Sequence, residues 1–183
     1  MVIDGNGLGI GLVDYMVKQQ VDSETGDIIP DFGVYNDNDL EYKKFRTQNC
    51  EYDALYILKA NAPINTEAHA NAQTQINAGK VKFLIDEKVA RQKLLGTKVG
   101  QNMKPEERAE YLKPFTLTSI LKEEMMNLRE ENEGINIILK QANRGIKKDK
   151  FSAFEYGLYY IKQEEDSKKK KKRFSAKDFM FKN

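Results

Sequence analysis

Short apolar runs alternate along the chain with stretches in which apolar residues recur at helical spacing. Residues 2–4, 54–60 and 135–139 are apolar runs of strand length, and residues 81–85 predict a short strand or extended segment. A short apolar run bounded by turn residues is typical of a buried strand. The chain therefore predicts three or four short strands separated by longer segments.

The segments between these strands carry the spacing of amphipathic helices. Gly79 is expected to end one helix, and Pro105 begins another well because the first turn does not use its missing N–H. Two polar stretches, residues 22–39 and 96–104, predict exposed loops. The predicted helices are residues 9–20, about 65–78 and 86–95, one from Pro105, one marked by Leu117, Leu121, Met125 and Leu128, and a last one from about Asp149.

This order of elements predicts an α/β fold with a largely parallel sheet. A sheet of three or four strands is thin, and a fuller domain is expected to have more. We expect one domain over residues 1–165 and a charged, poorly ordered tail over residues 166–183. The tail contains an unbroken basic run, Lys168 to Arg173, which is typical of a solvated segment and also adds non-specific affinity for phosphate.

The composition of the chain says more about its cellular compartment than about its binding partner. The chain has 183 residues and a formal net charge of +2, which is too close to neutral to indicate a partner by itself. No run approaches the roughly 18 apolar residues of a membrane-spanning helix, and the N-terminus lacks the pattern of a secretory signal. The single cysteine, Cys50, can form neither an internal disulfide nor a cysteine-based zinc site. These features favour a reducing, cytosolic compartment.

Asp4 ends the first predicted strand and is followed by a glycine-rich turn, Gly5 to Gly11, and a helix. A dinucleotide-binding fingerprint does not fit, since Ile10 and Leu12 stand where its spacing requires glycine. The Walker pattern of a P-loop is absent from the sequence as well. Two interpretations of Asp4 stay open: a ligand for Mg²⁺ or Mn²⁺ facing a groove, or a turn aspartate that caps the helix.

Asp149 lies at the start of the last predicted helix, among Lys147, Lys148 and Lys150. Aspartate is a preferred N-cap residue, so a structural role is one interpretation. Three surrounding lysines are unusual for a cap and suit a metal carboxylate beside a phosphate backbone, with the lysines holding nucleic acid. His69, the one histidine of the chain, stands in a helix rich in Ala and Asn and is expected at the surface or in packing rather than as a ligand.

Six segments follow one another in an order that is informative as a whole. Two of them are acidic motifs, Ile3-Asp4-Gly5-Asn6-Gly7-Leu8-Gly9 and Lys148-Asp149-Lys150-Phe151-Ser152-Ala153. The others are residues 55–60, 64–69, 79–85 and 123–129. Together they resemble the nuclease domain of terminase large subunits from tailed bacteriophages, over roughly residues 2–165.

The resemblance implies an incomplete RNase H-like nuclease fold that lacks the family's first strands and its upstream ATPase domain. It implies that Asp4 and Asp149 are the second and third catalytic acids and bind two Mg²⁺ or Mn²⁺ ions about 4 Å apart. The first acid has no counterpart in this sequence. The implied partners are double-stranded DNA, the terminase small subunit and the portal protein, in the host cytoplasm and without a membrane.

The implied activity is endonucleolytic cleavage of concatemeric DNA during genome packaging. Because two carboxylates hold a pair of ions poorly in competition with phosphate, we expect the isolated chain to be weakly active or inactive. The alternative is a non-catalytic DNA- or portal-binding fragment of a split or truncated terminase gene. Substitution of both acids separates these hypotheses, because cleavage depends on the acids and binding does not.

Overall fold

The computed structural model describes residues 1–38, 41–47, 50 and 53–173. The chain forms two compact units. The first, here called the sheet unit, comprises residues 1–65 and 160–183, and the second, the hairpin unit, comprises residues 66–159. The region expected to form one domain, residues 1–165, therefore includes the whole hairpin unit and most of the sheet unit.

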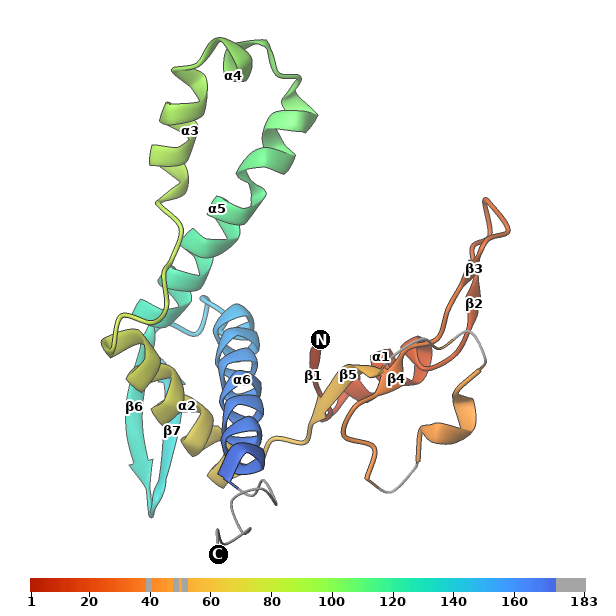
Figure 1. Ribbon diagram of the computed structural model, residues 1–183. Helices are drawn as coiled ribbons and strands as arrows, with labels where there is room; N and C mark the ends of the chain where they lie inside the picture. The colour runs from red at the N-terminus through yellow and green to blue at the C-terminus, as the bar shows by residue number, and fades with distance from the viewer. Residues whose placement is uncertain (39–40, 48–49, 51–52, 174–183) are drawn as a thin grey trace, which may run out of the picture. The chain divides into compact units, whose positions relative to one another are not determined.

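A small parallel sheet organises the sheet unit (Figure 1). Its strands are β1 (Val2–Asp4), β5 (Asp53–Leu58) and β4 (Gly33–Val34), in the order β1-β5-β4. Both pairings are parallel, with Ile3 opposite Ile57 and Val34 opposite Leu55. The mixed α/β class and the small parallel sheet predicted from the sequence are confirmed.

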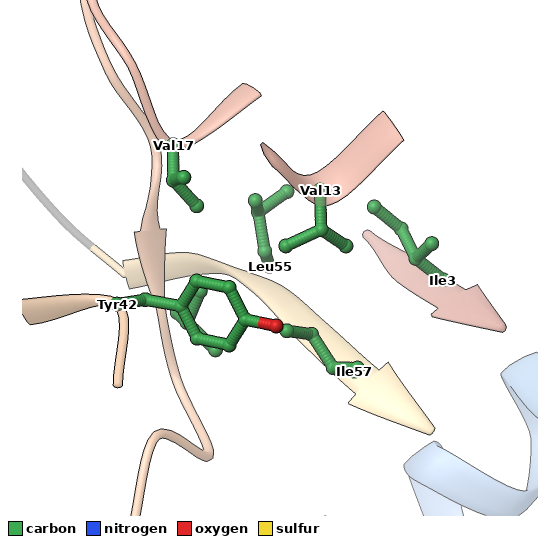
Figure 2. Packing of buried hydrophobic residues seen from close by; sticks show 7 residues of the cluster. Ile3, Val13, Val17, Tyr42, Leu55 and Ile57 are labelled. Atoms are coloured by element: carbon green, nitrogen blue, oxygen red, sulfur yellow. The ribbon is translucent and has the colours of Figure 1, made fainter. Parts of the chain in front are cut away.

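The core of the sheet unit lies between this sheet and helix α1 (Leu8–Met16). Figure 2 shows Val13 of α1 close to Leu55 of β5, with Val17 beside them. Val13 and Leu55 are fully buried, and burial of one such side chain contributes about 1.5–3 kcal/mol. The other buried members of the cluster are Ile3, Val34, Tyr42 and Ile57.

The prediction of an exposed loop over residues 22–39 is wrong in part. Two-residue strands β2 (Gln20–Val21) and β3 (Ile28–Ile29) form an antiparallel ribbon, and β4 enters the sheet. The polar residues do build the turn of this ribbon, because Asp22 Oδ1 accepts hydrogen bonds from the amides of Glu24 and Thr25. Strands of two residues are too short to show alternation, so the sequence pattern misses them.

The hairpin unit takes its name from an antiparallel β-hairpin. β6 (Leu128–Glu133) pairs with β7 (Asn136–Gln141), with Glu133 opposite Asn136. Gly134 supplies the positive φ of 61° that such a tight turn requires. The helices that lie wholly or partly in this unit are α2 (Ala62–Asn77), α3 (Glu87–Leu95), α4 (Lys98–Asn102), α5 (Pro105–Met126) and α6 (Asp149–Arg173).

Several local predictions for this unit differ from the structure. Residues 136–139 of the run 135–139 lie in β7, which pairs with β6 and not with the parallel sheet, and Ile135 lies in the turn before β7. Leu128, expected on a helix, begins β6, whose remaining residues are all polar and exposed and so lack an apolar alternation. Residues 81–85 carry no regular strand, and the expected loop 96–104 contains α4, which Thr97 caps through its side chain.

The helix predicted from Pro105 and the helix predicted around Leu117 to Leu128 form one continuous element, α5, which begins at Pro105 as expected and passes through Pro114.

Helix α6 begins at Asp149 as expected and continues to Arg173, whereas the sequence predicted a poorly ordered tail from residue 166. Lysine is a good helix former, and Lys169 pairs with Asp166 one turn away at 3.4 Å. Residues 174–183 of the predicted tail lie outside the described residues.

Helix α1 offers a matched pair of glycines for a stability test. A Cβ on Gly9 would overlap the carbonyl oxygen of Asp4, whereas a Cβ on Gly11 would meet no atom within 4 Å. We expect Gly9→Ala to lower the free energy of unfolding by about 1–3 kcal/mol and Gly11→Ala to raise it by about 0.5–1 kcal/mol. Urea unfolding of the two variants measures both, and an equal effect would contradict this packing of α1.

Candidate functional site

Asp4 stands at the carboxyl end of β1, in register with Leu58 of β5, and its side chain is exposed. Its Oδ1 accepts a hydrogen bond from the amide of Asn6 at 3.0 Å, which closes a tight turn. The amide of Gly5 donates to the carbonyl of Leu58 at 2.8 Å and so extends the β1–β5 pairing past the acid. The carboxylate is therefore held at the sheet edge where α/β proteins commonly place functional groups.

The glycine-rich turn allows the chain to pass close to itself beside this carboxylate. A Cβ on Gly5 would lie 2.7 Å from the Ile57 side chain. Asn6 Nδ2 donates to the carbonyl of Ala60 at 2.9 Å and fixes the turn against the end of β5. The N-cap of α1 is Gly7, and no side chain makes a capping hydrogen bond to this helix. Asp4 therefore does not cap α1, and its side chain bonds to the turn at Asn6 instead.

Asp149 is the first residue of α6 and is exposed, as are Lys147 and Lys148. A carboxylate in the first turn of a helix is stabilised by the helix dipole. Lys150 differs from its neighbours, because its Nζ lies 3.6 Å from Oε1 of Glu124, a carboxylate that is only 2 % exposed. The structure therefore keeps Asp149, Lys147 and Lys148 at the surface and gives Lys150 a partner within the protein.

Glu124 caps α6 from a different helix. Its Oε2 accepts a hydrogen bond from the amide of Phe151 at 2.9 Å, and the bond is buried. One of the four N-terminal amides that a helix leaves unpaired is thus satisfied by α5, while Lys150 balances the charge. This arrangement fixes the start of α6 and with it the position of Asp149.

The loop before α6 is held by side-chain amides. Asn127, which is buried, accepts a hydrogen bond from the amide of Asn143 and donates to its carbonyl. Gln141 Nε2 donates to the carbonyl of Ile146 at 2.6 Å. The segment that leads to Asp149 is therefore tied to the end of α5 and to β7.

His69 lies between two carboxylates, an arrangement that the sequence did not predict. Its Nε2 lies 2.8 Å from Oε1 of Glu130 on β6, and Gln73 Nε2 donates to the same oxygen. Its Nδ1 faces Oε2 of the buried Glu155 on α6 at 3.7 Å. The Glu155 carboxylate, followed by that of Glu130, raises the pKa of His69 above its usual 6.5, although burial acts in the opposite direction.

A pocket of about 240 Å³ adjoins His69. Its polar lining comes from His69, Gln73, Asn77 and Glu130. Its apolar lining comes from Ala72, Ile76, Met125, Leu128, Leu139 and Phe151.

A second pocket of about 230 Å³, in the sheet unit, is lined in part by Arg46 and Asp53, which pair at 3.2 Å. Neither pocket contains Asp4 or Asp149.

The two predicted acids belong to different units, Asp4 to the sheet unit and Asp149 to the hairpin unit, and each has its geometry within its own unit. Among the described residues, no three His, Cys, Asp or Glu side chains gather in a way that could hold a metal ion. The same part of the chain contains no helix with an apolar stretch long enough to cross a bilayer.

Sequence reasoning missed Glu124, Glu130 and Glu155. A signal existed for Glu155, which stands four residues after Phe151 and so falls on the buried face of α6. Glu124 and Glu130 occur in runs of acids that read as solvated surface. Glu124 is buried whereas Glu130 remains exposed, and the packing partners of each acid decide this difference.

Comparisons with protein-family models, curated proteins and solved structures found no match to this chain.

The cap on α6 predicts a difference between two neighbouring acids of α5. We expect Glu124→Ala to lower the free energy of unfolding by about 1.5–3 kcal/mol, because a charged hydrogen bond is lost and Lys150 loses its partner. The matched control is Glu123→Ala, which removes an exposed acid and should change stability by less than about 0.5 kcal/mol. Hydrogen exchange at the Phe151 amide should be faster in the first variant alone, and equal exchange in both would rule out the cap.

The His69 cluster predicts a pH-dependent stability. Because the pKa of His69 is raised in the folded protein, its protonated form contributes stability that is fully present below the unfolded value of 6.5. That contribution is lost as the pH rises through the folded pKa. His69→Gln should remove this part of the pH dependence, as measured by unfolding at a series of pH values.

The His69 pKa itself can be read without assignment, since the chain has one histidine. An NMR titration of the imidazole should give a pKa above 6.5, and Glu155→Gln should lower it. Glu131→Gln is the control, because Glu131 is the next residue on β6 and pairs with Lys140 instead. A titration unaffected by Glu155→Gln would show that this carboxylate does not act on His69.

Proposed function

We propose that the chain is the C-terminal nuclease portion of a terminase large subunit, acting in metal-dependent cleavage of concatemeric DNA during genome packaging. The observation that carries the proposal is Asp4, an exposed carboxylate at the carboxyl end of a parallel strand, followed by a turn in which Gly7 has a positive φ and a side chain on Gly9 would overlap the backbone. An RNase H-like fold is part of the proposal, and the parallel pairing of β1 and β5 beneath α1 is compatible with it.

Asp149 is the second acid of the proposed site. Its exposure at the start of α6, beside exposed Lys147 and Lys148, suits a carboxylate that works next to a phosphate backbone. Lys150 contributes charge nearby while it also pairs with Glu124. The buried cap from Glu124 supports this role, because a metal-binding carboxylate needs a fixed backbone.

Asp4 and Asp149 each offer exposed carboxylate oxygens, the type of ligand that Mg²⁺ and Mn²⁺ prefer. When bound, such ions supply activation of water and stabilisation of the leaving oxygen of a phosphodiester. The protein's part is to hold the two carboxylates and to position the DNA with lysines. The resemblance implies one further carboxylate, the family's first acid, which has no counterpart in this sequence.

The proposal predicts cleavage that requires both acids. Plasmid DNA with Mn²⁺ should be cut weakly by the chain alone and more strongly when the missing portion of the large subunit is supplied. Asp4→Asn and Asp149→Asn should each reduce the complemented rate by at least about 100-fold, because each removes a metal ligand.

Asp14→Asn and Asp166→Asn are the matched controls, since they change acids of α1 and α6 outside the proposed site and should retain the rate. Robust cutting by the double variant at Asp4 and Asp149 would exclude the nuclease assignment. DNA or portal binding that persists in a chain with no complemented cutting would favour the non-catalytic fragment instead.

A further inference from the structure

An arm of the hairpin unit, residues 80–104, is strongly basic. It comprises the segment before α3, α3 itself and α4, and it carries seven Lys and Arg against two Asp and Glu. Figure 1 shows α3 running beside α5, with α4 at the turn between them. The chain as a whole is nearly neutral, so this concentration of positive charge is local.

The acids of the arm and of its partner helix are mostly engaged by protein groups. Asp86 caps α3 by accepting from the amide of Lys88 at 2.9 Å, and Glu87 pairs with Arg91 one turn later. On α5, Glu107 accepts from the amide of Lys104, and Glu110 lies 3.4 Å from Lys113. Arg91 and Lys113 thereby offset the charges of Glu87 and Glu110, whereas Asp86 and Glu107 keep theirs, and residues 80–104 retain a net charge of +5.

The lysines, in contrast, are exposed and uncompensated. Among the residues that the structure describes, no ion pair forms at their ammonium groups. They are Lys80, Lys82, Lys88, Lys93, Lys98 and Lys104. An exposed cation without a partner is stabilised by a nearby anion, and several on one element create a field that attracts a polyanion.

The arm presents these lysines on a fixed backbone. Ala90, Leu94 and Leu112 form a small buried core between α3 and α5. Arg108 donates to the carbonyls of Gly100 and Met103 and so fixes the end of α4. A fixed backbone reduces the conformational entropy that the arm would lose on binding a ligand.

We propose that this basic arm binds the phosphate backbone of double-stranded DNA, independently of base sequence. The choice of DNA among polyanions rests on the proposed nuclease function. Double-stranded DNA carries one negative charge per about 1.7 Å of its axis, so it is a strong ligand for several exposed lysines on one element. The arm thereby adds to the lysines beside Asp149 a second contact with the same substrate.

The test compares two triple variants of the full chain that carry the same net charge. K88Q/K93Q/K98Q neutralises three uncompensated lysines of the arm. K18Q/K44Q/K140Q neutralises three lysines outside the arm and α5, of which Lys18 and Lys44 lie over the Phe45 ring and Lys140 pairs with Glu131. Fluorescence anisotropy with a labelled DNA duplex in EDTA, over a series of salt concentrations, measures affinity without cleavage.

We expect the arm variant to bind at least about tenfold more weakly at low salt, with a slope of log affinity against log salt that is less steep by about 3. The control variant should remain close to wild type. Equal affinities of the two variants, or wild-type binding to anionic vesicles as tight as to the duplex, would overturn the proposal. The nuclease function is judged separately, by the dependence of complemented cleavage on Asp4 and Asp149.

Discussion

The sheet unit depends on the hydrogen-bonding capacity of β5, which has a neighbour along both edges. β1 pairs along one edge, and β4 pairs along the other. Beyond β4, the Asn36 side chain accepts from the amide of Ile57 and donates to its carbonyl, and so replaces a further strand residue. Because buried backbone groups must be paired, these contacts allow β5 to bury Leu55 beneath α1. Asp4 is positioned as a consequence of the same pairing.

The hairpin unit is held to a large degree by buried polar groups. Glu124 caps α6, Asn127 clamps the loop before it, and Asn71 of α2 donates to the carbonyl of Leu158 at 3.1 Å. His69 lies against Glu155 in the same region. Each such group costs free energy if it loses its partner, so these contacts specify one arrangement of the helices more sharply than apolar packing alone. The contacts of Glu124 and Asn127 also fix the backbone at the start of α6, where Asp149 lies.

Buried and exposed charged side chains have different roles in this protein. Buried acids act on the protein itself, as Glu124 does at α6 and Glu155 does at His69. Exposed acids such as Asp4 and Asp149 remain available to ligands. Exposed lysines without acidic partners gather on the arm, whereas Lys140 and Lys113 are paired. Since unpaired surface charge attracts counterions and polyanions over long range, this distribution is the physical basis of the proposed contact with DNA.

The sequence by itself determined the elements with a strong local signal: the strand ending at Asp4, the apolar strand β5, and the helices that begin at Pro105 and Asp149. Period, proline position and chain composition are local properties, so a single sequence displays them. Tertiary structure alone decided that β7 pairs with β6 and that β4 enters the parallel sheet, because the two-residue β4 and the polar β6 lack a pattern. It also decided the fate of individual acids: Glu124 is buried and Glu123 exposed, although they are adjacent and chemically identical. Burial and pairing depend on residues distant in the chain, and no local rule contains that information.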